Sequence, residues 1–172
     1  IPSMTINPSF FIIIDISFFY MKKILLFVTI FFIEHNSYAL EKKAYFAGGC
    51  FWCMEESFDQ VEGVISSISG YSGGHLKNPT YQDVIYKDTG HVEAIEITYD
   101  SNIVSYESLL NVYWRNIDPF DSEGQFCDKG KSYRSVIFFQ NQLEKEFINK
   151  SFKNLESKFD REIVTLVWKF KE

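Results

Sequence analysis

The sequence feature that most constrains the fold is a predicted strand that turns into a helix within two residues. Residues 42–47 are typical of a short strand, which Gly48 and Gly49 end. Residues 50–61 then have helical periodicity, with a predicted inner stripe of Cys50, Cys53, Met54, Ser57, Phe58 and Val61. The pattern therefore predicts a sharp strand-to-helix turn with a cysteine at the start of the helix.

The rest of the chain predicts elements in an order typical of one α+β domain. Strands are expected at 64–71, 91–99, 133–140 and 162–168, helices at 106–117 and 141–158, a helical turn at 80–86, and irregular chain at 118–132. We predict a ferredoxin-like two-layer sandwich, in which helices pack on a mixed or antiparallel sheet.

The first part of the chain is expected to be an upstream extension and a signal peptide, residues 1–39. Two lysines at 22–23 precede an apolar stretch at 24–33, and cleavage is expected after Ala39. An uncleaved anchor, supported by the apolar run at 10–20, is the alternative. We therefore expect export to the periplasm, with a membrane-anchored or cytoplasmic protein as the alternatives, and a folded domain at 40–172.

The charge pattern argues against a nucleic-acid partner. The formal net charge is -6, and no basic run is longer than a pair of lysines. A protein that binds nucleic acid would carry a basic stripe. No nucleic-acid partner is therefore expected.

All three cysteines, Cys50, Cys53 and Cys127, follow the expected signal, and an odd count favours a free or cycling thiol. Cys50 would lie in the first turn of the helix, where unpaired N–H groups and the macrodipole favour a thiolate. Cys53 lies one turn further along, in the C-x-x-C spacing of dithiol chemistry. Two alternatives stay open. The cysteines are small buried apolar residues, or they are half of a metal site completed by Cys127, His75 or His91.

Phe51 and Trp52 lie off the predicted core stripe. Two large rings beside a reactive thiol favour recognition of an apolar group. Packing of the rings against the next loop is the alternative.

Glu93 interrupts the apolar face of the strand predicted at 91–99. Alternate residues of a strand share a face, so Glu93 is expected beside Ile95 and Ile97. Burial there would raise the pKa of the carboxyl, which could then keep a proton and act as a general acid. A glutamate leaning into solvent at the strand end is the alternative.

The segment from Gly48 to Cys53 resembles the active-site motif of the A-type peptide methionine sulfoxide reductases. Further segments resemble motifs of the same family and occur in the family's order: residues 70–74, 78–81, 89–93 and 128–135. The similarity extends from about residue 44 to residue 165.

The resemblance implies how the chemistry would proceed. Cys50 would attack the sulfoxide sulfur and, through a rearranged intermediate, release methionine and become a sulfenic acid. Glu93 would protonate or hydrogen-bond the sulfoxide oxygen. The S epimer would be the substrate.

The resemblance also implies which residues hold the substrate. Tyr81 and Tyr133 would bind the sulfoxide oxygen through their hydroxyls, and Asp128 would support the site through water. Phe51 and Trp52 would enclose the methyl group. No metal and no bound cofactor are implied.

A second thiol would resolve the sulfenic acid to a disulfide. Helical spacing favours Cys53, and Cys127 is the alternative because it adjoins Asp128. Thioredoxin or a thioredoxin-like protein, or dithiothreitol in vitro, would then reduce the disulfide. The expected partners are oxidised proteins, free methionine sulfoxide and this reductant, and the chain is expected to be a monomer. A general C-x-x-C thiol–disulfide oxidoreductase and an exported metal-binding module are the competing interpretations.

The chain departs from the family pattern in two places. Ile117 stands before Asp118 and Pro119 where many members have histidine, which we expect to be a subtype difference. The family usually continues past the equivalent of residue 172 with an aromatic and acidic tail, and Leu166 stands where the family has glutamate. The catalytic domain at 40–172 is therefore expected to lack its C-terminal tail.

Overall fold

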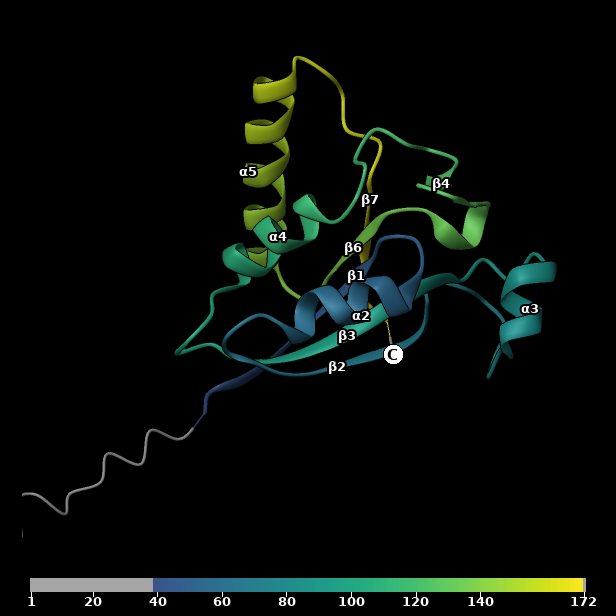
Figure 1. The fold of residues 1–172 in the computed structure, drawn as a ribbon, viewed down its shortest axis with the longest axis horizontal. Helices are drawn as coiled ribbons and strands as arrows, with labels where there is room; N and C mark the ends of the chain where they lie inside the picture. Colours follow the sequence, from purple (N-terminus) through teal and green to yellow (C-terminus); the bar gives the residue numbers. More distant parts are fainter. Residues whose placement is uncertain (1–38, 172) are drawn as a thin grey trace, which may run out of the picture. The chain divides into compact units, whose positions relative to one another are not determined.

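The computed structural model describes residues 39–171 (Figure 1). Apart from Ala39 itself, the expected upstream extension and signal peptide lie outside the described residues. Within residues 39–171, no helix is long and apolar enough to cross a membrane.

A five-stranded mixed sheet is the framework of the domain. Its strand order is β2 (Val64–Ser72), β3 (Val92–Asp100), β1 (Glu41–Ala47), β6 (Val136–Phe139) and β7 (Leu166–Lys169). Strand β1 is antiparallel to both β3 and β6, and β2 is antiparallel to β3, whereas β7 runs parallel to β6.

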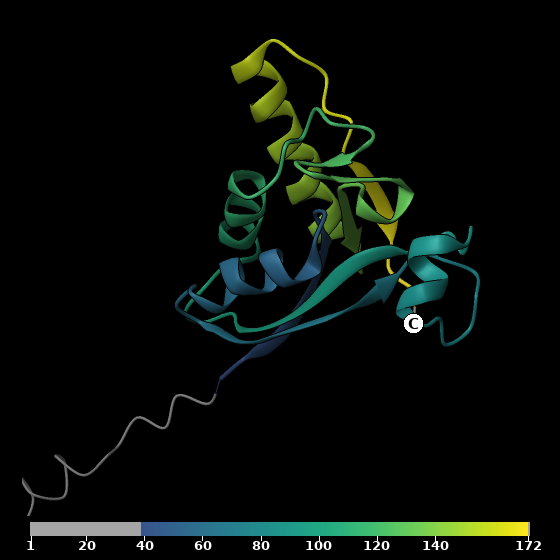
Figure 2. The same ribbon diagram turned by 45° about the vertical axis from the view of Figure 1, so that its right-hand side comes forward.

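Three helices form the second layer: α2 (Phe51–Asp59), α4 (Tyr106–Arg115) and α5 (Gln142–Phe159). Helix α2 lies along β2 and β3, and α4 packs beside α5, while the short α3 (Tyr81–Tyr86) lies towards one end of the sheet (Figures 1 and 2). The core between the layers includes Ala44, Phe46, Met54, Phe58, Ile95, Ile97, Leu109, Leu110, Ile137 and Ile148. The predicted α+β fold, with helices packed on a mixed sheet, is confirmed.

Strand alternation sorts the side chains between the two faces of the sheet. Ile95 and Ile97 of β3 face the helices, whereas Val92 and Ala94 belong to a second buried cluster. In that second cluster the ring of Tyr45 stacks on Phe170, with centroids 3.7 Å apart. Glu93 therefore shares the helix-facing side of β3 with Ile95 and Ile97.

The segment between α4 and β6 differs from the prediction. In place of wholly irregular chain it contains a hairpin of β4 (Gly124–Gln125) and β5 (Asp128–Lys129), followed by a 3₁₀ turn, η1 (Lys131–Tyr133). That turn uses the residues expected to begin the strand at 133, so β6 begins only at Val136.

The last strand is also shorter than predicted at its start. Val164 donates its backbone N–H to the carbonyl of Pro119 at 2.9 Å, outside the sheet. Pairing with β6 begins at Leu166, whose N–H donates to the carbonyl of Ser135 at 3.0 Å. The strand predicted at 162–168 is therefore Leu166–Lys169.

Candidate active site

The turn between β1 and α2 requires glycine at two successive positions. A Cβ on Gly48 would lie 2.7 Å from Ile117 Cγ2 and 2.8 Å from Met54 Sδ, and a Cβ on Gly49 would lie 2.6 Å from the Cβ of Gln125. Gly49 also has a φ of +84°, in the left-handed region that favours glycine. The two glycines thus leave room for the protein's own side chains, which pack closely against the turn.

Two buried polar side chains brace this turn, and the sequence did not identify either as a site residue. The Tyr113 hydroxyl donates to the carbonyl of Ala47 at 2.8 Å. Gln125 is 1% exposed, and its amide accepts the N–H of Asp118 at 2.7 Å and donates to the Asp118 carbonyl at 2.9 Å. The turn before Cys50 is therefore hydrogen-bonded to α4 through Tyr113, and it packs against the β4–β5 hairpin through Gln125, which Asp118 holds in place.

Cys50 lies immediately before the first residue of α2, and its carbonyl accepts the N–H of Met54 at 3.2 Å. Its side chain is half-buried. The N–H groups of the first helical turn, which have no partner within the helix, lie beside it, and these groups and the helix dipole favour negative charge.

Glu93 lies at the same helix end. Its side chain is 2% exposed, and Oε2 accepts the backbone N–H of Phe51, the residue after Cys50, at 3.1 Å. Burial raises the pKa of the Glu93 carboxyl, the Phe51 N–H lowers it, and the charge of Asp128 raises it again. The alternative of a solvent-exposed glutamate is wrong, and the nucleophile candidate and the acid candidate meet at the start of α2.

Two phenols lie near enough to the carboxyl for its charge to raise their pKa, and a third is hydrogen-bonded to one of them. Tyr71 pairs with Glu93 across β2 and β3, and its ring centroid lies 5.8 Å from that of Phe51. The hydroxyls of Tyr81 and Tyr133 are hydrogen-bond partners. Desolvation, and then the charge of Glu93 among the further causes, raises the pKa of both Tyr71 and Tyr133. Tyr71 was not among the predicted site residues, because its register opposite Glu93 depends on which strands are neighbours.

The three thiols are free, and Cys53 and Cys127 are exposed. A hydrogen bond with Cys50 raises the pKa of the Cys53 thiol, with smaller contributions from burial and from the charges of Cys50, Asp128 and Glu56. Cys127 lies in the turn of the β4–β5 hairpin. Exposure of Cys53 excludes the interpretation that it is a buried apolar residue.

The alternative metal half-site is not assembled in the part of the chain that the structure describes. Within residues 39–171, no three His, Cys, Asp or Glu side chains are grouped so that they could hold a metal ion. Cys127, His75 and His91 therefore do not complete a ligand set with Cys50 and Cys53.

The two rings after Cys50 differ in environment. Phe51 is 6% exposed and belongs to the core, so its predicted position off the core stripe is wrong. The buried stripe of α2 consists of Phe51, Met54 and Phe58, because the helix is rotated on the sheet so that the ring is buried and Cys53 is exposed. Trp52 is 65% exposed, with its ring centroid 5.1 Å from that of Phe51.

Comparisons of this chain with known proteins all indicate the same family. The model of the family described as "Peptide methionine sulfoxide reductase" matches residues 42–172. A curated relative from Listeria monocytogenes, "Peptide methionine sulfoxide reductase MsrA", is 51% identical over 130 residues, which are 74% of this chain and 73% of the relative.

Solved structures agree. The structure described as methionine sulfoxide reductase A of Corynebacterium diphtheriae has 28% identity and a TM-score of 0.65, and the match covers 74% of this chain and 64% of that one. Mxr1 from Saccharomyces cerevisiae in reduced form has 26% identity and a TM-score of 0.71, covering 77% of each chain. Mxr1 has also been solved in complex with Trx2, where 17% identity and a TM-score of 0.53 over 82% and 84% of the chains indicate the fold alone.

Proposed function

The chain belongs to the A-type peptide methionine sulfoxide reductases, a family of oxidoreductases, and we propose that it repairs oxidised proteins by reducing the S epimer of methionine sulfoxide, protein-bound and free. The observation that carries the proposal is the hydrogen bond between the N–H of Phe51 and the buried carboxyl of Glu93. The bond holds the carboxyl beside the residue that follows Cys50, and burial of that carboxyl, which raises its pKa, supports a proton-bearing acid there.

In the first step, the Cys50 thiolate attacks the sulfoxide sulfur while Glu93 gives its proton to the sulfoxide oxygen. After rearrangement the oxygen is bonded to the Cys50 sulfur, and methionine leaves as the thioether. The enzyme sulfur is oxidised by two electrons to a sulfenic acid, and the substrate sulfur is reduced by two. The raised pKa of Glu93 supports this role, because a general acid must hold its proton at working pH.

Substrate binding uses the phenols and the exposed indole. Tyr81 and Tyr133 donate hydrogen bonds to the sulfoxide oxygen, and the raised pKa of Tyr133 keeps its hydroxyl protonated. Asp128 acts through water. Trp52 encloses the methyl group from the solvent side, and Phe51 supports the Trp52 ring from the core.

In the second step, the Cys53 thiol condenses with the sulfenic acid, which forms a disulfide and releases water. The hydrogen bond between Cys53 and Cys50 supports Cys53 over Cys127 as the resolving thiol. A thioredoxin-like dithiol then reduces the disulfide and is itself oxidised. The existence of a complex between Mxr1 and Trx2 supports this choice of reductant. Dithiothreitol serves in vitro.

The test is a thioredoxin-coupled assay with the separated S and R epimers of methionine sulfoxide. We expect turnover of the S epimer only, and none by Cys50→Ser. Glu93→Gln should lose much of the turnover. Its matched control is Glu96→Gln, which should keep the turnover because Glu96 lies on the same strand but pairs with Lys43 at 2.5 Å. Reduction of insulin that survives Glu93→Gln, without reduction of the sulfoxide by the unsubstituted chain, would instead identify a general thiol–disulfide oxidoreductase.

We also propose that the protein is exported to the periplasm and acts there as a monomer. The lysine pair, apolar stretch and small-residue cleavage pattern before Leu40 support export. Cell fractionation followed by N-terminal sequencing tests this. A periplasmic protein that begins at Leu40 is the expected result, and a cytoplasmic protein that retains residues 21–39 would contradict it.

A further inference from the structure

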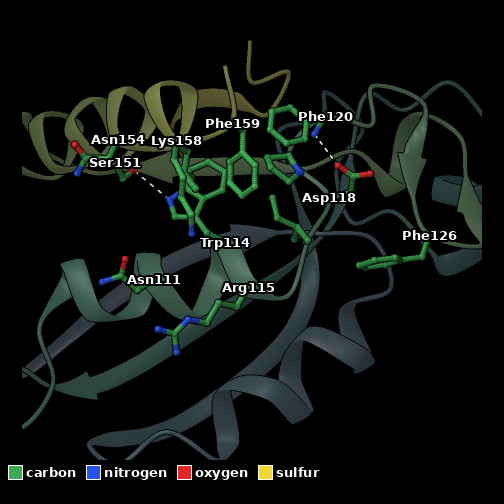
Figure 3. A pocket seen from close by; sticks show the side chains of 13 residues that line it. Asn111, Trp114, Arg115, Asp118, Phe120, Phe126, Ser151, Asn154, Lys158 and Phe159 are labelled. Carbon is green, nitrogen blue, oxygen red and sulfur yellow. Dashed lines mark hydrogen bonds between the residues drawn. The ribbon is translucent and has the colours of Figure 1, made fainter. Parts of the chain in front are cut away.

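A cavity of about 640 Å³ lies between α4, the C-terminal half of α5 and the chain that follows α4 (Figure 3). The rings of Trp114, Phe120 and Phe159 form much of its wall. Phe120 and Phe159 meet edge-on with centroids 5.6 Å apart, and the Trp114 indole N–H donates to Ser151 Oγ at 3.1 Å. The cavity thus has an apolar wall that is already fixed in position.

The charge of this cavity opposes that of the whole protein, which is -6. Arg115 and Lys158 line it, and the Arg161 guanidinium lies 4.4 Å from the centroid of the Phe120 ring. None of these three cations forms a salt bridge within residues 39–171. The acidic residue of the lining, Asp118, accepts the N–H of Phe120 at 2.9 Å. The site is therefore a cationic, ring-lined hollow on an acidic protein.

The cavity shares a wall with the turn that carries Cys50. Ile117, in the lining, packs against Gly48, and the Asp118 backbone is held by Gln125, which packs against Gly49. The residue after Gln125 is Phe126, which is 66% exposed and lines the cavity at the end nearest the hairpin (Figure 3). The contacts through Ile117 and Gln125 thus place the cavity beside the turn that carries Cys50, on the path of residues that flank a methionine bound there.

We propose that this cavity is a subsite for polypeptide substrates, and that it binds an acidic stretch of the substrate next to the oxidised methionine. The proposal rests on the proposed function and adds a substrate preference to it. The cations attract acidic side chains, and the rings receive an apolar side chain of the same stretch. Free methionine sulfoxide lacks the flanking residues and does not reach the subsite.

The test uses dithiothreitol as reductant, so that no protein reductant takes part. Peptides carry one methionine S-sulfoxide flanked, on one side or the other, by three glutamates or three lysines, and free methionine S-sulfoxide is the reference. For one of the two sides, we expect kcat/KM to be about fivefold higher for the peptide with glutamates on that side than for the matching lysine peptide. This is the size expected for two exposed ion pairs. The preference is expected to disappear at about 0.5 M salt because exposed charges are screened.

The double variant Arg115→Glu, Lys158→Glu is expected to remove or invert the glutamate preference, with peptide rates normalised to free methionine S-sulfoxide for the same variant. The control double variant Lys42→Glu, Lys153→Glu makes the same change in net charge at exposed positions outside the cavity lining, and should keep the preference.

Every other outcome overturns either the subsite alone or the proposed function as well. Normal turnover of the free sulfoxide with no preference among the peptides, or a preference that survives in the cavity variant, overturns the subsite alone. An effect of the variant that appears only when thioredoxin replaces dithiothreitol overturns it in favour of a docking site for the reductant. No turnover of the free sulfoxide by the unsubstituted chain overturns the proposed function, and the subsite with it.

Discussion

The two halves of the candidate site are held by different kinds of structure. Cys50 and Glu93 lie at the start of α2 and on β3, a strand with neighbours on both sides. Asp128 and Tyr133 belong to the segment 118–135, where the two paired strands are only two residues long and side-chain hydrogen bonds hold part of the remaining backbone.

This difference separates the chemistry from the fit to substrate. Helix and sheet backbones hold the reacting pair with little freedom, as general acid catalysis of an attack on sulfur requires. The segment 118–135 depends on a few side chains such as Gln125, and it borders both the proposed site for the sulfoxide oxygen and the cavity beside α5. Substitutions in the first half should alter the rate without loss of stability, and substitutions in the second should lower both.

The largest expected effect is on the rate, which substitutions in the two halves should reduce by different amounts. Glu93→Gln removes the proposed proton donor and should reduce kcat/KM for the S epimer about 10²- to 10³-fold. Tyr133→Phe removes one of the two hydroxyls proposed to bind the sulfoxide oxygen and should reduce kcat/KM only about tenfold, since Tyr81 remains. Steady-state kinetics with dithiothreitol measures both, and equal losses would contradict the division of roles.

Gly49→Ala tests the junction between the halves. A Cβ there meets Gln125, and φ is +84°, so we expect destabilisation of about 3 kcal/mol together with a loss of activity. Denaturant unfolding measures the change. The control is Gly70→Ala, where a Cβ meets no atom within 4 Å, and its stability should change by less than about 1 kcal/mol.

Gln125→Ala tests the irregular half alone. It removes the partner of the Asp118 N–H and leaves the Asp118 carbonyl only the longer bond from the Asp121 N–H at 3.4 Å, so we expect a loss of about 2 kcal/mol and a few-fold lower kcat/KM. The exposed Gln142 on α5 provides the control, Gln142→Ala, which should be neutral. A Gln125 variant as stable as the unsubstituted chain would show that the hairpin does not depend on this amide.

The smallest expected effect is a gain in stability, not a loss. Burial raises the pKa of Glu93 above its ordinary value of 4.5, so the folded chain keeps a proton that the unfolded chain releases above that pH. The unsubstituted chain therefore loses stability as pH rises through the folded-state pKa, and Glu93→Gln does not. Melting at pH 8 and at pH 4.5 should give the variant the higher Tm at pH 8 and a smaller difference at pH 4.5. A variant that melts lower at pH 8 would contradict the direction of this shift.

What the sequence alone could predict follows the same division. The alternation at 91–99 predicts Glu93 on the buried face, because the period of two is fixed by strand geometry whatever the strand's partners are. The helical stripe predicts Met54 and Phe58 correctly but not Phe51, because neighbouring stripes of one helix are distinguished only by how the helix sits on the sheet.

The remainder depends on contacts between distant segments. Tyr71 faces Glu93 only because β2 pairs with β3 in that register. Gln125 lies in chain without periodicity, and its burial follows from the approach of the Gly48–Gly49 turn. A local pattern carries no signal for either, whereas the motif that contains Cys50 lies at an element boundary that glycines mark plainly.

The most direct test of the central claim is the pH dependence of a single turnover of methionine S-sulfoxide by the reduced chain and by Glu93→Gln. If a protonated Glu93 beside Cys50 delivers the proton, the rate of the unsubstituted chain falls as pH rises through the raised pKa of Glu93, and the slow variant lacks that fall. The same high-pH fall in both proteins would contradict the account.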